Sequence, residues 1–187
     1  MKLKIYKISH PLIRLMLNRM TTEYLSEINT KYYERYIGFL VIYEIFRKYM
    51  IIKVLHIKLL EGSKKVETID IRTKYIILTN TSDTYSMITD IQCIISNLTI
   101  IHTEYDDINR IKNYIEKTNK ITENSYIFII EKNTTNYKII NLIDYLKNTN
   151  KITLDKISIG NIFSNSKVLK KIGEKYPELK VYTTKIE

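Results

Sequence analysis

The residues with the clearest capacity for chemistry lie in a polar segment, 131–138, that follows the apolar and β-branched run 126–130. An apolar pattern at helical spacing comes next, so the sequence predicts a strand, a polar elbow and a helix. In open α/β sheets a ligand lies beyond the carboxyl end of a strand, against the N-terminus of the next helix. An active site is therefore expected at this elbow, although the elbow has no glycine to let the backbone approach a phosphate.

The rest of the chain supports one domain built around such units. At 187 residues and 44% hydrophobic content, it is long enough to bury a sizeable core. We expect strands at 2–6, 75–78, 98–102, 156–159 and 179–183, and helices at 85–96, 106–117 and 164–175. The alternation predicts an α/β fold, a mostly parallel twisted sheet flanked by helices. Residues 1–50 form an N-terminal helical part, 51–72 a small β-hairpin and 73–187 the α/β core.

Single reactive side chains give little support for a catalytic centre. Cys93 is the only cysteine, so no disulfide framework and no cysteine metal cluster is expected, and its apolar helical surroundings predict a small core residue. His10 precedes a proline at a predicted helix start, where it is expected to be structural. His56 and His102 stand alone in apolar runs and are expected to be packed. No metal site is predicted.

One helical stripe within 21–50 joins Tyr36, Leu40, Tyr43 and Phe46, with Ile37 beside it, and is expected to be the packed side of that helix. Its tyrosines and nearby arginines could contact nucleic acid, but a helix surface or a subunit contact explains them better. The most apolar run, 37–46, is short and contains Glu44, so no membrane span is expected.

The net charge of +10 admits two explanations. It could mark a surface for nucleic acid or an anionic membrane. The lysines are spread along the chain, however, and the abundance of Ile, Lys, Asn and Tyr is typical of an AT-rich genome. A solvated lysine surface is therefore the favoured explanation.

Three segments resemble the uracil phosphoribosyltransferases, particularly their cyanobacterial and plastid branch. They are His10-Pro11-Leu12-Ile13, the helix 38–47 (matching at Gly38, Tyr43, Glu44 and Arg47) and 176–183, which is similar to the family's Tyr-Pro-x-Leu-x-Val-Tyr-Thr segment. The resemblance implies a type I phosphoribosyltransferase fold and a homodimer. The family's reaction transfers a phosphoribosyl group from phosphoribosyl pyrophosphate (PRPP), with Mg²⁺, to uracil and yields UMP.

The segment that matches the family's PRPP loop departs from its pattern. The resemblance implies that Glu131 replaces the acid that contacts ribose hydroxyls and that Thr135 matches the loop threonine, with Thr134, Asn136 and Lys138 as further phosphate contacts. Asn136 and Tyr137 replace both glycines. Tyr137 tolerates positive φ poorly and is expected to place bulk where phosphate would bind.

A second elbow, 79–84, matches the loop that contacts pyrophosphate. Ser82 stands at its arginine position, Asp83 adds a negative charge beside the expected pyrophosphate, and Thr84 follows. The family's uracil-binding Gly-Asp-x-Gly-Asp segment would begin just after Glu187, where the sequence ends, so uracil selectivity is expected to be lost.

These departures favour a catalytically inactive homologue that keeps the scaffold, needs no cofactor and acts through protein contacts. A divergent enzyme that makes UMP from uracil and PRPP with Mg²⁺ is the alternative. An RNA-binding regulator on the same scaffold is the second alternative. The plastid stroma is the expected location of a soluble protein of this branch, or else the cytoplasm of an AT-rich organism.

Overall fold

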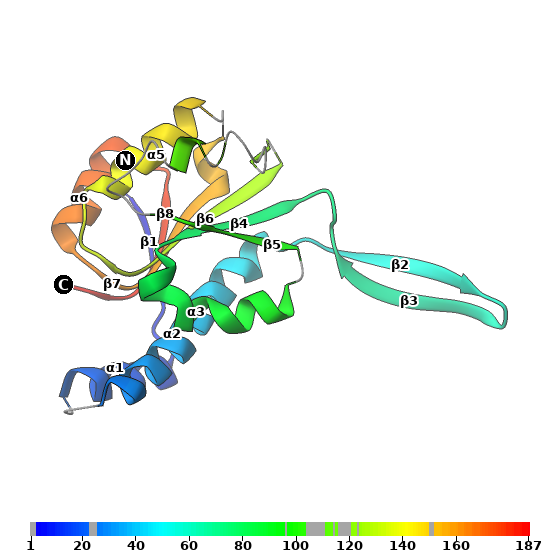
Figure 1. Ribbon diagram of the computed structural model, residues 1–187, viewed down its shortest axis with the longest axis horizontal. Helices are drawn as coiled ribbons and strands as arrows, with labels where there is room; N and C mark the ends of the chain where they lie inside the picture. The colour runs from blue at the N-terminus through cyan, green and yellow to red at the C-terminus, as the bar shows by residue number, and fades with distance from the viewer. Residues whose placement is uncertain are drawn as a thin grey trace.

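A six-stranded sheet forms the centre of the molecule (Figure 1). The structure, a computed structural model, describes residues 3–22, 26–95, 97–103, 111–113, 115, 121–122, 124–149 and 152–187. In spatial order the strands are β1 (Lys4–Lys7), β8 (Lys180–Ile186), β7 (Ile157–Ser164), β6 (Ser125–Thr134), β4 (Lys74–Thr79) and β5 (Leu98–His102). Every neighbouring pair in this sheet is parallel, which confirms the predicted α/β fold class.

Helices cover both faces of the sheet, because its strands are apolar on both sides. On β6, Ile127 and Ile129 pack under α5 (Lys138–Thr149) and α6 (Ser166–Lys175). Phe128 and Ile130 point the other way, as successive strand residues must. They pack under α1 (Pro11–Thr22), α2 (Glu27–Tyr49) and α3 (Thr81–Ile94). A short 3-10 helix, η1 (Leu154–Lys156), precedes β7.

The predicted hairpin is present and lies outside the main sheet. β2 (Ile52–Leu59) and β3 (Gly62–Ile69) pair antiparallel with each other and project from the body of the molecule (Figure 1). Gly62 has φ 145°, a backbone conformation that favours glycine and ends the tight turn. The hairpin leaves α2 and returns to β4, so it is an insertion between two core elements.

Several predicted boundaries were wrong, and two of them affect the candidate site. The predicted elbow 79–84 is mostly helix, because α3 begins at Thr81 behind the capping side chain of Asn80. The predicted elbow 131–138 is half strand, because β6 continues through Thr134 beside β7. The predicted helix 106–117 falls largely outside the described residues.

Four expectations about burial were also wrong. Cys93 is exposed on α3, and both His56 and His102 are exposed. On α2 the predicted stripe is only partly buried. Phe46 is buried as expected, but Tyr36 and Tyr43 are about half exposed, and Ile37, Val41 and Ile45 form most of the buried side. His10 is structural, as predicted: its Nδ1 accepts from the Leu12 N–H at 3.2 Å.

Across the part of the chain that the structure describes, none of the helices combines the length and apolar character that a bilayer crossing requires. The prediction of no membrane span agrees with this finding.

Candidate functional site

The two segments predicted to form the site come together at the carboxyl edge of the sheet. A cavity of about 360 Å³ lies there between the ends of β4 and β6. It is lined by Asn80, Asp83, Thr84, Ile130, Glu131, Lys132, Asn133, Thr135 and Asn136. Five of the eight predicted site residues (Asp83, Thr84, Glu131, Thr135 and Asn136) therefore share one cavity, whereas Ser82, Thr134 and Lys138 do not line it.

The N-terminus of α3, where an anion could bind, is occupied by the protein's own groups. The side chain of Asn80 accepts from the Ser82 N–H at 3.2 Å and donates to Asp83 Oδ2 at 2.9 Å. A carboxylate in the first turn also interacts favourably with the helix dipole. Asp83 and Asn80 thus use the positive end of α3 that a phosphate would need.

Thr84 is buried and its hydroxyl is engaged. It donates to the Asn80 carbonyl at 2.8 Å, and its Oγ1 lies 2.6 Å from Thr79 Oγ1. Thr79 in turn donates to the Ile130 carbonyl at 2.6 Å, which links the ends of β4 and β6. Because these bonds hold the two strands together, the Thr84 hydroxyl serves the scaffold.

At the end of β6, Glu131 and Thr134 lie in different surroundings. Glu131 lines the cavity and is 8% exposed. Thr134 is fully buried, and its Oγ1 accepts from Asn161 Nδ2 at 2.7 Å. Asn161 also accepts from Ser164 Oγ at 2.8 Å, so Thr134 belongs to a buried polar network between β6 and β7. This network explains how a polar stretch continues as a central strand.

The residues between β6 and α5 begin the helix rather than enclose a ligand. Asn136 Oδ1 accepts from the Lys138 N–H at 2.9 Å, which caps the first turn of α5. The Tyr137 ring is not among the groups that line the cavity. It lies under Lys171 of α6, with Nζ 4.3 Å from the ring centroid, so the expected obstruction by Tyr137 is not seen.

Lys132 is the one cation among the described residues that line the cavity, and it contacts a buried acid. Its Nζ lies 2.5 Å from Glu34 Oε1 on α2, and Glu34 is 2% exposed. Glu34 was not predicted as a site residue. The available signal was its helical spacing to Ile37 and Val41, which places a carboxylate on the buried stripe of α2.

The charges around the cavity do not favour an anion. Asp83 and Glu131 are acidic, and the Lys132 ammonium is balanced by Glu34. Within the described residues, no group of three or more His, Cys, Asp or Glu side chains is placed to hold a metal ion. The cavity is suited to neutral hydrogen-bonding groups rather than to a phosphate or pyrophosphate.

Comparison with known proteins supports the fold and leaves the activity open. No protein-family model matches the chain, and no curated protein matches its sequence. A solved structure of the AQ2163 protein from Aquifex aeolicus is similar over 98% of this chain and 87% of its own, with a TM-score of 0.69 and 16% sequence identity. At that identity the similarity shows a shared fold alone.

Proposed function

We propose that this chain is a uracil phosphoribosyltransferase homologue that keeps the family's scaffold, does not turn over PRPP and acts through contacts with proteins. The sequence resemblance at 10–13, 38–47 and 176–183 supports the family. The parallel α/β sheet is consistent with a phosphoribosyltransferase-like fold. The proposal includes the homodimer and the plastid stroma, both taken from the resemblance.

The observation that carries the proposal is the charge of the carboxyl-edge cavity. Pyrophosphate is strongly anionic, and charge placed around the leaving group is usually the largest part of such catalysis. Here Asp83 and Glu131 line the cavity while Glu34 neutralises Lys132. Loss of one stabilising donor commonly lowers a rate by about 10²–10³, so the combined changes predict negligible turnover.

Calorimetric titration of PRPP with Mg²⁺ into the folded protein tests the proposal, together with an assay for UMP formation from PRPP and uracil. We expect no binding tighter than about 1 mM and no UMP above the background of the assay. Micromolar binding that Glu131→Ala abolishes, with UMP formed, would instead establish the divergent enzyme.

A charge variant tests the physical explanation separately. Asp83→Asn removes one repulsive charge from the cavity and is expected to strengthen the binding of inorganic pyrophosphate by about threefold to tenfold. Asp155→Asn is the matched control, because Asp155 lies exposed in η1, before β7 and away from the carboxyl edge. An equal effect of both substitutions would show that net charge, and not the cavity, controls binding.

A further inference from the structure

β1 forms one end of the six-stranded sheet, and one of its two edges is open. Among the described residues β8 is its one neighbour, so β1 has no strand on its other side (Figure 1). All four residues of β1 are exposed, with Ile5 at 40% and Tyr6 at 39%. An open edge presents backbone N–H and C=O groups that a further strand can bind.

The backbone groups on this open edge belong to Ile5 and Lys7. On the paired edge, the Ile8 N–H donates to the Thr183 carbonyl of β8 at 2.8 Å. Successive residues of a paired strand direct their N–H and C=O groups to opposite sides. Tyr6 therefore faces β8 as Ile8 does, whereas Ile5 and Lys7 face away from β8. Each of these two residues offers one donor and one acceptor.

A hollow follows the same edge of β1. This edge trough has a volume of about 1000 Å³ and is lined by Ile5, Tyr6, Lys7, Ile8, Ser9, His10, Glu44, Arg47, Lys48 and Tyr182. Side chains of successive strand residues point to opposite faces of a sheet. A hollow that touches each of residues 5–8 must therefore run along the edge of the strand. An extended chain in the edge trough would lie beside the outward backbone groups of β1.

The edge trough is basic. Lys7, Arg47 and Lys48 line it together with one acid, Glu44, which Arg47 binds at 2.9 Å. Lys48 Nζ lies 5.1 Å from the centroid of the Tyr6 ring, so its charge is held beside the strand. The cavity at the carboxyl edge of the sheet is lined by two acids and one cation, so the two hollows differ in sign. An anionic group is expected to bind in the edge trough.

The lysines of β1 select the kind of strand that can bind. Lys4 and Lys7 stand at its two ends, and Lys4 lies opposite Lys180 of β8 in the register. A second copy of β1 would bring the same lysines alongside, where like charges repel. Lysines on an edge strand oppose such self-association. An acidic strand meets no such repulsion, and the net charge of +10 attracts it.

We propose that the open edge of β1 binds an extended acidic segment of a partner protein, which adds a strand to the sheet and places carboxylates in the edge trough. Main-chain hydrogen bonds supply affinity in this mode of binding, and alternate side chains supply specificity. A peptide fits better than a nucleic acid, because a peptide backbone carries N–H and C=O groups at the spacing of a strand.

The two faces of the added strand meet different surroundings. Tyr6 stacks on Tyr182 on the side of the sheet that α2 covers, and Lys48 lies over Tyr6 on that side. Carboxylates are therefore needed on the α2 side of the added strand. Ile5 points to the other side and is 40% exposed, so an apolar residue fits there. The bound segment is thus one in which acidic and apolar residues alternate.

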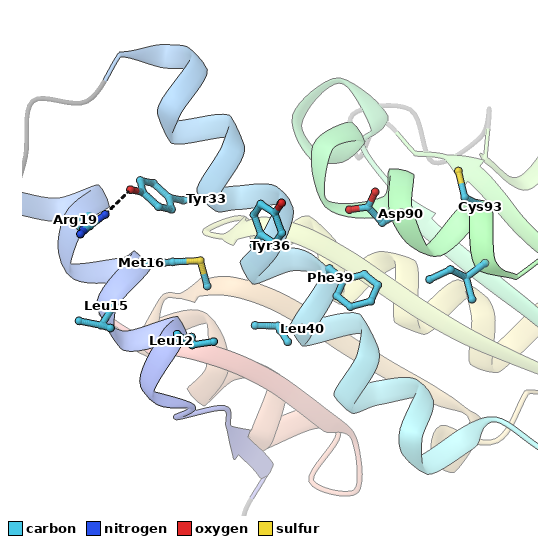
Figure 2. Close-up of a pocket in the computed structure, with 11 residues that line it drawn as sticks. Leu12, Leu15, Met16, Arg19, Tyr33, Tyr36, Phe39, Leu40, Asp90 and Cys93 are labelled. Carbon is cyan, nitrogen blue, oxygen red and sulfur yellow. Dashed lines mark hydrogen bonds between the residues drawn. The ribbon is translucent and has the colours of Figure 1, made fainter.

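An apolar groove elsewhere on the protein is a separate surface. The groove has a volume of about 820 Å³ and lies between α1, α2 and α3, with Leu12, Leu40 and Phe39 in its lining (Figure 2). Its acid, Asp90, accepts from Arg35 Nε at 2.8 Å. Among the described residues the groove and the edge trough share no lining residue, so the two can bind different partners at the same time.

A protein partner at this edge rests on the proposed function, in which the chain acts through protein contacts. The PRPP titration and the UMP assay test turnover, whereas peptide binding tests the edge of β1. An active enzyme that still binds the peptide would overturn the proposed function alone. An inactive protein that does not bind it would overturn the strand partner alone.

Calorimetric titration with a synthetic octapeptide tests the proposal. The probe is an acetylated and amidated peptide of alternating Glu and Val, for which we expect a dissociation constant of about 10–100 μM. A block peptide of four Glu and four Val has the same charge. It is expected to bind at least about tenfold more weakly, because its acids no longer share one face.

N-methylation of the alternating peptide tests the main-chain hydrogen bonds directly. Alternate N–H groups of a strand face the same side, so methylation of one alternate set is expected to abolish binding. Methylation of the other set is expected to weaken binding less than about threefold, because those groups face solvent. Equal effects of both sets would show that the peptide does not bind as a strand.

Two matched pairs of protein variants test the surface. Ile5→Pro removes one outward N–H, which an edge strand tolerates, and is expected to weaken binding at least about tenfold. Ile5→Ala keeps that N–H and is expected to weaken binding less than about threefold. Lys48→Glu is expected to weaken binding at least about tenfold. Lys64→Glu makes the same charge change on the projecting hairpin and is expected to have less than about a threefold effect (Figure 1).

Specific outcomes would overturn the proposal. Absence of binding at about 1 mM peptide would remove it. Equal losses from Lys48→Glu and Lys64→Glu would show that net charge, and not the edge trough, attracts the peptide. The charge variants give this answer even where proline disturbs folding, which circular dichroism detects. Tighter binding of an octanucleotide of uridylate than of the peptide, lost in Lys48→Glu, would assign the basic residues to RNA instead.

Discussion

The two helical layers on the sheet differ in how many large apolar side chains they expose to solvent. Among the described residues, α5 and α6 contain no large apolar side chain that is exposed. The layer formed by α1, α2 and α3 has several, namely Leu12, Leu15, Ile28, Tyr32, Tyr36, Tyr43, Tyr85 and Ile94. Both layers pack a closed apolar core against the sheet, so the contrast lies only on their outer surfaces.

The apolar side chains that stabilise the fold are therefore distinct from the apolar side chains that the protein exposes. The outer surface of α5 and α6 is closed by polar contacts, because the Asp144 carboxylate accepts hydrogen bonds from Lys175 Nζ and the Tyr176 hydroxyl. The α1–α3 layer carries apolar side chains that its own fold does not cover. This layer is therefore where a partner is expected to bind, whereas Asn80, Asp83 and Thr84 at the carboxyl-edge cavity already form hydrogen bonds within the protein.

The largest effect is expected from the ion pair that joins the α1–α3 layer to the sheet. Lys132→Met leaves Glu34, which is 2% exposed, without the ammonium that balances it. Breaking a buried pair costs about 3–5 kcal/mol, and we expect about 3 kcal/mol because the Lys132 side chain is 34% exposed. Urea unfolding of the variant and the wild-type protein, followed by circular dichroism, measures this loss of stability.

The double variant Glu34→Leu/Lys132→Met is the control for this loss. It removes both charges at once, and its unfolding free energy is expected to lie within about 1 kcal/mol of the wild-type value. A loss of less than about 1 kcal/mol in unfolding free energy for Lys132→Met alone would show that the ion pair is no stronger than a surface salt bridge. The two layers would then not differ in the strength of their ion pairs.

Alanine substitutions at a matched pair of glycines are expected to give an intermediate loss of stability. A Cβ at Gly38 on α2 would lie 2.8 Å from Met87 Cα on α3, where backbone has no room to move. Gly38→Ala is expected to cost about 1–3 kcal/mol. In the other layer, a Cβ at Gly173 would lie 3.0 Å from Leu3 Cβ, a side chain near the chain end.

Gly173→Ala is expected to stay within about 0.5 kcal/mol of the wild-type stability, since the gain in helix propensity offsets the tight contact. Thermal unfolding of the two variants, side by side, measures the difference. Equal losses would show that the two layers are packed equally closely around these glycines.

The smallest effect is expected from the contacts that close the α5–α6 surface. Burial opposes ionisation of Asp144, but hydrogen bonds from Lys175 and Tyr176 outweigh it and lower the pKa of Asp144. A carboxyl whose pKa is lower in the folded state stabilises the protein above its unfolded pKa of about 3.9, and this contribution is lost as the pH falls further.

Asp144→Asn is therefore expected to cost less than about 1 kcal/mol between pH 5 and 8, because Lys175 is half exposed. The difference from the wild-type protein should shrink below about pH 4. Urea midpoints across this range measure it. A difference that grows toward acidic pH would contradict the assigned direction of the pKa shift.

The sequence predicted the layers of the fold better than the ends of its elements. Strand and helix alternation was sufficient for a parallel sheet, but polar residues concealed the last four residues of β6. Thr134 remains in the strand because Asn161 and Ser164, about 30 residues away, satisfy its hydroxyl and continue the network. Such partners are set by strand register, which no local pattern contains.

Around the candidate site, too, the sequence did not predict where the residues of α3 and α2 lie. Asparagine is a typical helix-capping residue. As a cap, Asn80 would have predicted Ser82, Asp83 and Thr84 in the first turn of α3. Glu34 was harder to find, because its partner Lys132 lies on a strand almost 100 residues further along. The tyrosine stripe of α2 was misplaced because aromatic and aliphatic residues are equally compatible with burial.

The place of β8 between β1 and β7 has a consequence for synthesis. Lys4 pairs with Lys180, so about 175 residues must be translated before β1 can join the sheet. At about 5–20 residues per second this takes roughly 10–35 s. During that interval Ile5 and Tyr6 have no strand beside them, and Tyr6 cannot yet stack on Tyr182. Of the described strands of this sheet, β1 is thus synthesised before the others and is the last that the sheet can incorporate.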